Sequence, residues 1–137
     1  MMRVNFFLIF LAVTMTGCAE TPQPKGTAPV LDSITFHKVL ERYTVIYPEF
    51  NFHSADGNVV AIHREIVSSN KPDGHLNFNP DATIHISADQ QRKGATYVGG
   101  WPCGPETYVV TLQAYLTDEN GNRSNVMKYA IPCNGIE

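Results

Sequence analysis

The clearest alternation of hydrophobic and polar positions lies in the last third of the chain. Residues 107–117 place apolar side chains at every second position, as one face of a β-strand requires. These are Tyr108, Val110, Leu112, Ala114 and Leu116. Residues 125–133 repeat the pattern with Met127, Tyr129, Ile131 and Cys133. A cluster of turn-forming residues that begins at Asp118 separates the two segments. The pattern predicts an antiparallel hairpin whose apolar face needs a second sheet to cover it.

Shorter alternations earlier in the chain predict the strands that supply this cover. They lie at residues 34–38, 42–54, 59–67, 76–78 and 82–86. In the second of these strands, Pro48 is expected to mark a switch of the inward face. The switch would pass from the positions of Val45 and Tyr47 to those of Phe50 and Phe52.

The third of these segments, residues 59–67, is expected to turn Val60, Ile62 and Ile66 inward. Arg64 breaks this apolar face, which predicts a bend at that position. With the hairpin, the chain has about seven short strands and no convincing helix. This predicts an all-β protein that is a single antiparallel sandwich.

Residues 88–105 carry no strand pattern and are predicted to form a long loop, with a helical turn over residues 89–93 as an alternative. The only tryptophan, Trp101, lies here close to Cys103. Two interpretations of its ring stay open, which are packing over a disulfide, the favoured one, and contact with a sugar or peptide. If a partner binds through loops, we expect Tyr97 and Trp101 to contact it, because a pinned loop loses less entropy on binding.

The N-terminus has a different character from the rest. Arg3 precedes an apolar run over residues 4–15, which is interrupted by Asn5. This run is too short for a typical membrane span, and it fits the hydrophobic core of a signal peptide.

The run ends in Met15-Thr16-Gly17-Cys18, which resembles the lipobox of bacterial lipoproteins. The resemblance implies cleavage before Cys18 and acylation of its thiol; an ordinary signal peptide and an uncleaved anchor are the alternatives. Ala19 stands where Asp would retain such a protein in the inner membrane, so the resemblance favours the outer membrane. The chain then divides into a signal peptide (1–17), a proline-rich tether (18–30) and a β-sandwich domain (31–137).

Cysteine usage agrees with export from the cytoplasm. The chain has three cysteines, and lipidation of Cys18 leaves Cys103 and Cys133 as a pair. In an oxidising compartment such a pair predicts a structural disulfide, with redox chemistry as the alternative.

Two segments, Phe50–Val60 and Tyr108–Asn122, also carry short motifs. The first contains Asp56-Gly57-Asn58-Val59, and the second contains Tyr-x-Val-x-Leu followed by Asp-x-x-Gly-Asn. These motifs resemble those of bacterial immunoglobulin-like domains of the PKD and fibronectin III kind. The resemblance implies an immunoglobulin-like sandwich and transfers no activity. It also implies a tyrosine corner, in which the Tyr108 hydroxyl bonds to a nearby backbone group.

Composition and motifs narrow the classes of function. The net charge of -3 and the pI near 5.9 leave no basic footprint for nucleic acid. The chain contains no G-x-S-x-G elbow, H-E-x-x-H motif or glycine-rich phosphate loop. We therefore expect no catalytic residue, no cofactor and no enzymatic activity.

Metal binding is also not expected, although three features were candidates. The histidine spacing gives no strand two adjacent ligands, and a cross-strand pair of His63 and His85 is the alternative. His63-Arg64-Glu65 with Pro102-Cys103 resembles part of the zinc deaminase signature, but Glu106 stands where the second cysteine is required. The segment Asp118–Asn122 offers oxygen ligands for calcium, yet an ordinary turn is favoured.

The sequence thus predicts a non-enzymatic binding or assembly module, held in the bacterial cell envelope by lipid on Cys18. Its expected partner is an envelope protein or a glycan. The alternatives are a structural subunit of a secretion or envelope apparatus and, third, a small periplasmic enzyme. An exposed apolar patch on one sheet favours the subunit, and a loop-end pocket with convergent polar groups favours ligand binding or catalysis.

Overall fold

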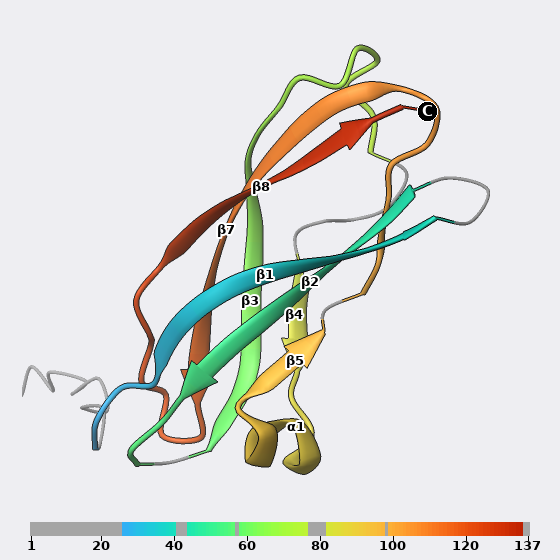
Figure 1. The fold of residues 1–137 in the computed structure, drawn as a ribbon. Helices are drawn as coiled ribbons and strands as arrows, with labels where there is room; N and C mark the ends of the chain where they lie inside the picture. The colour runs from blue at the N-terminus through green and yellow to red at the C-terminus, as the bar shows by residue number, and fades with distance from the viewer. Residues whose placement is uncertain (1–25, 41–43, 57, 77–81, 98, 136–137) are drawn as a thin grey trace, which may run out of the picture.

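The computed structural model describes residues 26–40, 44–56, 58–76, 82–97 and 99–135. Figure 1 shows two antiparallel sheets packed face to face, with one short helix at one end. The elements are β1 (Val30–Leu40), β2 (Thr44–His53), β3 (Val59–Ser69), β4 (Ala82–His85), α1 (Ala88–Lys93), β5 (Ala95–Tyr97), β6 (Trp101–Pro102), β7 (Thr107–Asp118) and β8 (Met127–Asn134).

Sheet A contains β1, β2 and β5 in that order, and β6 also pairs with β2. Sheet B has the order β4–β3–β7–β8. All of these pairings are antiparallel. The protein is therefore the immunoglobulin-like β-sandwich with one disulfide that the sequence predicts. The described residues form eight strands where about seven were expected.

The two ends of the sandwich differ. At the helix end lie α1, the β2–β3 turn and the turn that joins β7 to β8 (Figure 1). At the disulfide end, Cys103 is bonded to Cys133, which pairs with Tyr108 near the start of β7. The predicted hairpin is confirmed, because alternate residues of β7 and β8 are buried over its whole length.

The inner face of β2 is continuous, so the predicted switch at Pro48 is wrong. Four alternate residues of this strand are buried: Ile46, Pro48, Phe50 and Phe52. β5 pairs with β2 at residues 49–51, and β6 pairs with it at residues 45 and 46. Among the described residues, Pro48 thus lies opposite the gap between β5 and β6. A residue without an N–H is tolerated where a strand has no neighbour on one edge.

The start of β3 departs from the predicted parity because it contains a β-bulge. The register with β7 shifts between Val59 and Ala61, and both of these residues are buried. Val60 is exposed, so the prediction that it points inward is wrong. From Ala61 to Ile66 the pairing with β7 is regular, and the bend predicted at Arg64 is wrong as well.

Arg64 lies in the regular part of the β3–β7 ladder, opposite a small residue. Its partner on β7 is Ala114, which is fully buried. Tyr129 lies on β8, the next strand beyond Ala114. Burial raises the pKa of Tyr129 to about 12, and the charge and hydrogen-bonding capacity of Arg64 oppose that rise. Among the described residues, no group forms a hydrogen bond of good geometry with the Tyr129 hydroxyl.

The segment predicted as a long loop contains a helix and two strands. The alternative of a helical turn is confirmed by α1, whose cap residue Ser87 and third residue Gln90 exchange hydrogen bonds. The helix stops at Gly94, which has φ +63. The loop prediction is otherwise wrong, because β5 and β6 are too short to show a period-two pattern.

Two further strand predictions are changed by the structure. The first strand runs from Val30 to Leu40, which is longer at both ends than predicted. In the predicted strand at residues 76–78, Leu76 belongs to no strand, and the remaining residues lie outside the described part of the chain. In the part of the chain that the structure describes, no helix is long and apolar enough to cross a membrane.

Candidate functional site

The outer face of sheet A, which faces away from sheet B, carries a shallow hollow of about 260 Å³. We call it the aromatic hollow, and its lining residues are His37, Val39, Tyr47 and Tyr97. The pairing of His37 with Tyr47, and of Tyr97 with Glu49 beside it, brings three strands together at this place. The surface that the hollow exposes is apolar.

Alternation along the strands and one glycine explain why these side chains lie on the outer face. The odd-numbered residues of β2 point outward, since the even-numbered ones fill the core. Gly100 follows β5 and packs directly against this face. A Cβ at Gly100 would lie 2.5 Å from Val45 Cγ1 and 2.8 Å from the Tyr47 ring. Because Gly100 has no side chain, the backbone can pass close to the Tyr47 ring and pack against it.

The two predicted contact residues of the 88–105 segment lie on opposite faces of sheet A. Tyr97 is 54% exposed at the aromatic hollow. Trp101 is 1% exposed and lies in the core, where its Nε1 donates a hydrogen bond to the Tyr108 hydroxyl at 3.4 Å. The expectation that Trp101 offers its ring to a partner is therefore wrong. The favoured alternative agrees with the structure, because the indole belongs to the same buried cluster as Cys103.

The same contact between Trp101 and Tyr108 tests the predicted tyrosine corner. The Tyr108 ring is buried, as expected. Among the described residues, however, its hydroxyl bonds to Trp101 Nε1, which is a side-chain group and not the backbone group that the tyrosine corner requires, so this part of the prediction is wrong. Lys71 Nζ lies 5.9 Å from the centre of the Tyr108 ring and is ion-paired to Asp73 and Glu106. These contacts tie the β3–β4 connection to the start of β7.

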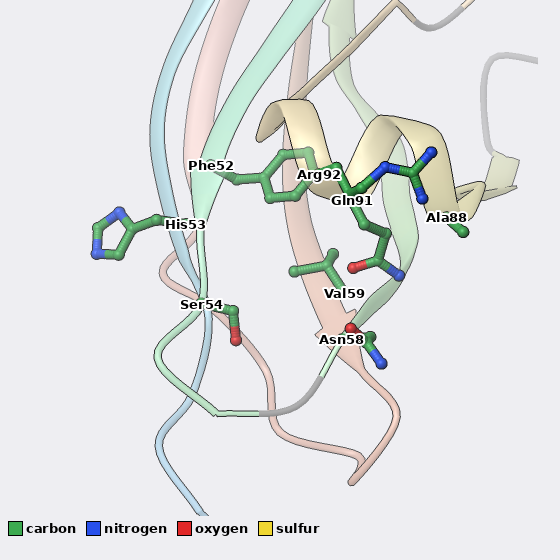
Figure 2. A pocket seen from close by; sticks show the side chains of 8 residues that line it. All are labelled: Phe52, His53, Ser54, Asn58, Val59, Ala88, Gln91 and Arg92. Atoms are coloured by element: carbon green, nitrogen blue, oxygen red, sulfur yellow. The ribbon is translucent and has the colours of Figure 1, made fainter.

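A second and larger cavity, of about 430 Å³, lies at the helix end between α1 and the β2–β3 turn (Figure 2). In Figure 2, Phe52, Val59 and Gln91 extend into it. Several of its polar side chains are bonded elsewhere: Ser54 Oγ donates to Asp56 O (2.6 Å), Asn58 Nδ2 donates to Glu119 Oε2 (3.1 Å), and Arg92 binds Asp89 (2.8 Å). These groups bond to neighbouring residues of the chain and do not converge on the cavity.

His53 lines this cavity but does not complete a catalytic arrangement with its neighbour. His53 Nδ1 lies 2.8 Å from Asp32 Oδ2, and both side chains are exposed to solvent. Figure 2 shows the His53 ring and the Ser54 hydroxyl pointing in different directions. A nucleophile needs its base within hydrogen-bond reach, so these three residues do not form a triad.

The outer face of sheet B carries a stacked cluster around His63. The His63 ring stacks on Tyr115 with 4.7 Å between ring centres, and Arg123 Cζ lies 3.5 Å from the centre of the Tyr115 ring. The two imidazole nitrogens contact the hydroxyls of Thr117 (2.9 Å) and Thr83 (3.1 Å). Burial lowers the pKa of His63, and the charges of Arg123 and His85 lower it further.

This arrangement answers the questions that the sequence left open about these residues. His63 pairs with Thr83, and His85 pairs with Ala61, so the two histidines are diagonal neighbours and not a directly opposed pair. Glu65 accepts a hydrogen bond from Gln113. Within the described ranges, no group of three or more His, Cys, Asp or Glu side chains is placed to hold a metal ion.

Asp118, one of the oxygen ligands that the calcium alternative would use, is buried in its own turn. Its Oδ1 accepts from the N–H groups of Asn120 (2.9 Å) and Asn122 (2.8 Å), and its Oδ2 accepts from Asn122 Nδ2 (2.8 Å). Gly121 supplies the positive φ of the turn, +82. The carboxylate therefore has a complete structural role, as the turn interpretation requires.

The predicted disulfide is confirmed, since Cys103 and Cys133 are bonded. Cys18, the predicted lipidation site, lies outside the described residues and stays a prediction. The sequence reasoning missed three lining residues of the aromatic hollow: His37, Val39 and Tyr47. A signal existed in β2, where Val45 and Tyr47 make the outward positions apolar while the inward positions of Ile46 and Pro48 are apolar too.

The fold and these sites define the class of the protein as an antiparallel β-sandwich with an exposed aromatic surface. No family model, curated protein or solved structure matches the chain.

Proposed function

We propose that this chain is a non-enzymatic binding or assembly module, anchored by lipid on Cys18 to the outer membrane of a bacterial cell envelope. The observation that carries the binding role is the aromatic hollow on the outer face of sheet A. The resemblance of residues 15–18 to a lipobox supports the anchor. A protein subunit of the envelope is the partner that the hollow fits best.

The hollow is hard to explain as a part of the fold. A two-sheet sandwich buries one face of each sheet, and its outer faces need no apolar side chains. Here Tyr97 leaves more than half of its surface in water. Aromatic side chains are enriched at protein–protein interfaces, and tyrosine gives contact area at a low cost in side-chain entropy.

The size and lining of the hollow favour a protein over a small molecule or a glycan. Its volume of about 260 Å³ lies below the range of about 300–1,000 Å³ that is usual for small-molecule pockets. Its exposed surface is apolar, whereas a sugar needs hydrogen-bonding groups next to the aromatic ring. A side chain of a partner protein needs neither a deep pocket nor polar lining.

Photo-crosslinking in intact cells tests the binding role. A photoreactive residue at position 97 should give a discrete adduct with an envelope protein. The matched control carries the same residue at Val109, which is similarly exposed on the outer face of sheet B. The adduct should be absent at Val109 and should be lost when Tyr47 is changed to Ala. Adducts of equal yield at both positions, or none at position 97, would contradict the proposal.

A separate experiment tests the anchor. Mass spectrometry of the protein isolated from envelopes should find an acylated Cys18 as the first residue. The Cys18→Ala variant should leave the membrane fraction or remain unprocessed. A correctly cut Cys18→Ala variant that stays in the membrane would show that the anchor lies elsewhere.

A further inference from the structure

The chain enters the sandwich at the helix end, and it is bound there from Thr27 onward. The backbone N–H of Thr27 donates a hydrogen bond of 2.8 Å to Asp56 Oδ2 in the β2–β3 turn. This bonding holds the pKa of the Asp56 carboxyl below its usual value, which keeps the acceptor charged. Gly26 lies against the same side chain, because a Cβ there would be 3.2 Å from Asp56 Cβ.

The residues that follow are fixed to both sheets. Pro29 is fully buried. Val30 opens β1 and pairs with His53 of β2. Leu31 exchanges two hydrogen bonds with the side chain of Asn125, which follows β7: Leu31 N donates to Asn125 Oδ1 at 2.9 Å, and Asn125 Nδ2 donates to Leu31 O at 3.0 Å. The part of the predicted tether from Thr27 to Val30 therefore belongs to the folded domain.

These contacts shorten the linker that is free to separate the domain from a lipid on Cys18. Only residues 19–26 remain between that cysteine and Thr27. The nine steps from Cys18 to Thr27, at about 3.1 Å per residue in an extended proline-rich chain, span about 28 Å. The domain is longer than this. The eleven residues from Tyr108, opposite the disulfide, to Asp118 at the helix end make ten steps of about 3.4 Å, which is about 34 Å.

We infer that the helix end of the sandwich faces the lipid surface that anchors the chain, and that the disulfide end is held away from it. This inference rests on the proposed lipid anchor. To turn the disulfide end toward the membrane, the linker would have to run back along the whole domain. That path of about 34 Å exceeds the linker's reach of about 28 Å.

The inference assigns different surroundings to the cavity at the helix end and to the aromatic hollow. The cavity of Figure 2 lies at the membrane-facing end, beside the β2–β3 turn. The aromatic hollow lies further along β1, at His37 and Val39, and its Tyr47 neighbours the residues that pair with β6. His37 lies seven positions after Val30 along β1, which is about 23 Å. The aromatic hollow is thus presented to a partner clear of the anchoring surface.

Paramagnetic relaxation in nanodiscs measures this orientation. The protein as the cell processes it is reconstituted with lipids that carry gadolinium on their headgroups. Broadening of backbone amide signals should be several-fold stronger in α1 and in the β2–β3 turn than around Cys103 and Lys71. Equal broadening at both ends, or stronger broadening at the disulfide end, would overturn the inference.

Two variants separate the orientation from the anchor. In the first, the Cys18 thiol is coupled chemically to a maleimide lipid, which is selective because Cys103 and Cys133 are bonded to each other. If native Cys18 proves unacylated, the proposed anchor fails, while this arm still reports the orientation. In the second, a Gly-Ser insertion before Gly26 doubles the free linker. The difference between the two ends should then shrink, and an unchanged difference would show that linker length does not set the orientation.

Discussion

Trp101 is the residue whose substitution tests the structure most directly. It is the largest fully buried side chain of the described residues, with 1% of its surface exposed. The change Trp101→Ala removes the indole from a core in which it packs near the disulfide and donates to the Tyr108 hydroxyl. The surrounding strands are held in two sheets and can close the resulting cavity only in part.

The expected loss of unfolding free energy is about 3–5 kcal/mol, the usual cost of truncating a buried Trp or Phe to Ala. The long hydrogen bond of 3.4 Å accounts for about 1 kcal/mol of this. Trp101→Phe keeps most of the apolar volume and should cost about half as much. Tyr97→Ala, four residues earlier, should change the free energy by less than about 0.5 kcal/mol, because its side chain lies on the surface.

Urea unfolding of the oxidised protein, followed by far-ultraviolet circular dichroism, measures these differences. Fluorescence is unsuitable, since Trp101 is the only tryptophan. With a slope of about 2 kcal/mol per M urea, a loss of 4 kcal/mol lowers the midpoint by about 2 M. A Trp101→Ala midpoint within experimental error of Tyr97→Ala would refute the reasoning. It would mean that the indole is not part of the core.

Three further predictions concern the disulfide and the buried tyrosines. Changing both Cys103 and Cys133 to Ala should cost about 3.7 kcal/mol by the chain-entropy estimate for a 30-residue separation, and an unshifted urea midpoint would contradict this. Tyr108→Phe should cost about 1 kcal/mol in the same assay, because it removes the acceptor of the Trp101 N–H; a neutral result would count against that bond. The pKa of Tyr129 is raised in the folded protein from 10.0 to about 12. The folded state therefore gains stability by keeping the Tyr129 hydroxyl neutral. This gain of roughly 2–3 kcal/mol is fully present below pH 10 and is lost as the pH rises through about 12. Tyr129→Phe should reduce this alkaline loss, and a slope equal to that of the unchanged protein would exclude Tyr129 as its source.

The hairpin and the disulfide could be predicted because their causes are visible in the sequence. The apolar positions of residues 107–117 repeat with the period of a strand, and the residues from Asp118 favour a turn. The pairing of Cys103 with Cys133 follows once Cys18 is set apart, since no other cysteine remains. The class of fold follows from the same alternation, because several half-apolar strands without helices must cover one another.

The wrong predictions come from places where the partner strand decides the conformation. A β-bulge against β7 moved Val60 to the surface, and no periodicity within β3 announces such a bulge. Pro48 remains in a straight strand because β5 and β6 leave a gap opposite it. Arg64 lies in a regular part of the ladder, opposite the small Ala114 of β7. In each case the deciding residue is distant in the sequence.

The candidate site shows the same division. Tyr97 and Trp101 are four residues apart, so in one continuous strand they would share a face. They belong to two different strands, because β5 ends at Tyr97 and β6 begins at Trp101. Each strand pairs with a different part of β2: Tyr97 lies opposite Glu49 on the outer face, and Trp101 lies opposite Ile46 on the inner face. The sequence alone could identify both aromatic rings as candidates. Only the tertiary structure decided that one is core and the other surface, because cross-strand pairing, and not local spacing, sets the face on which each side chain lies.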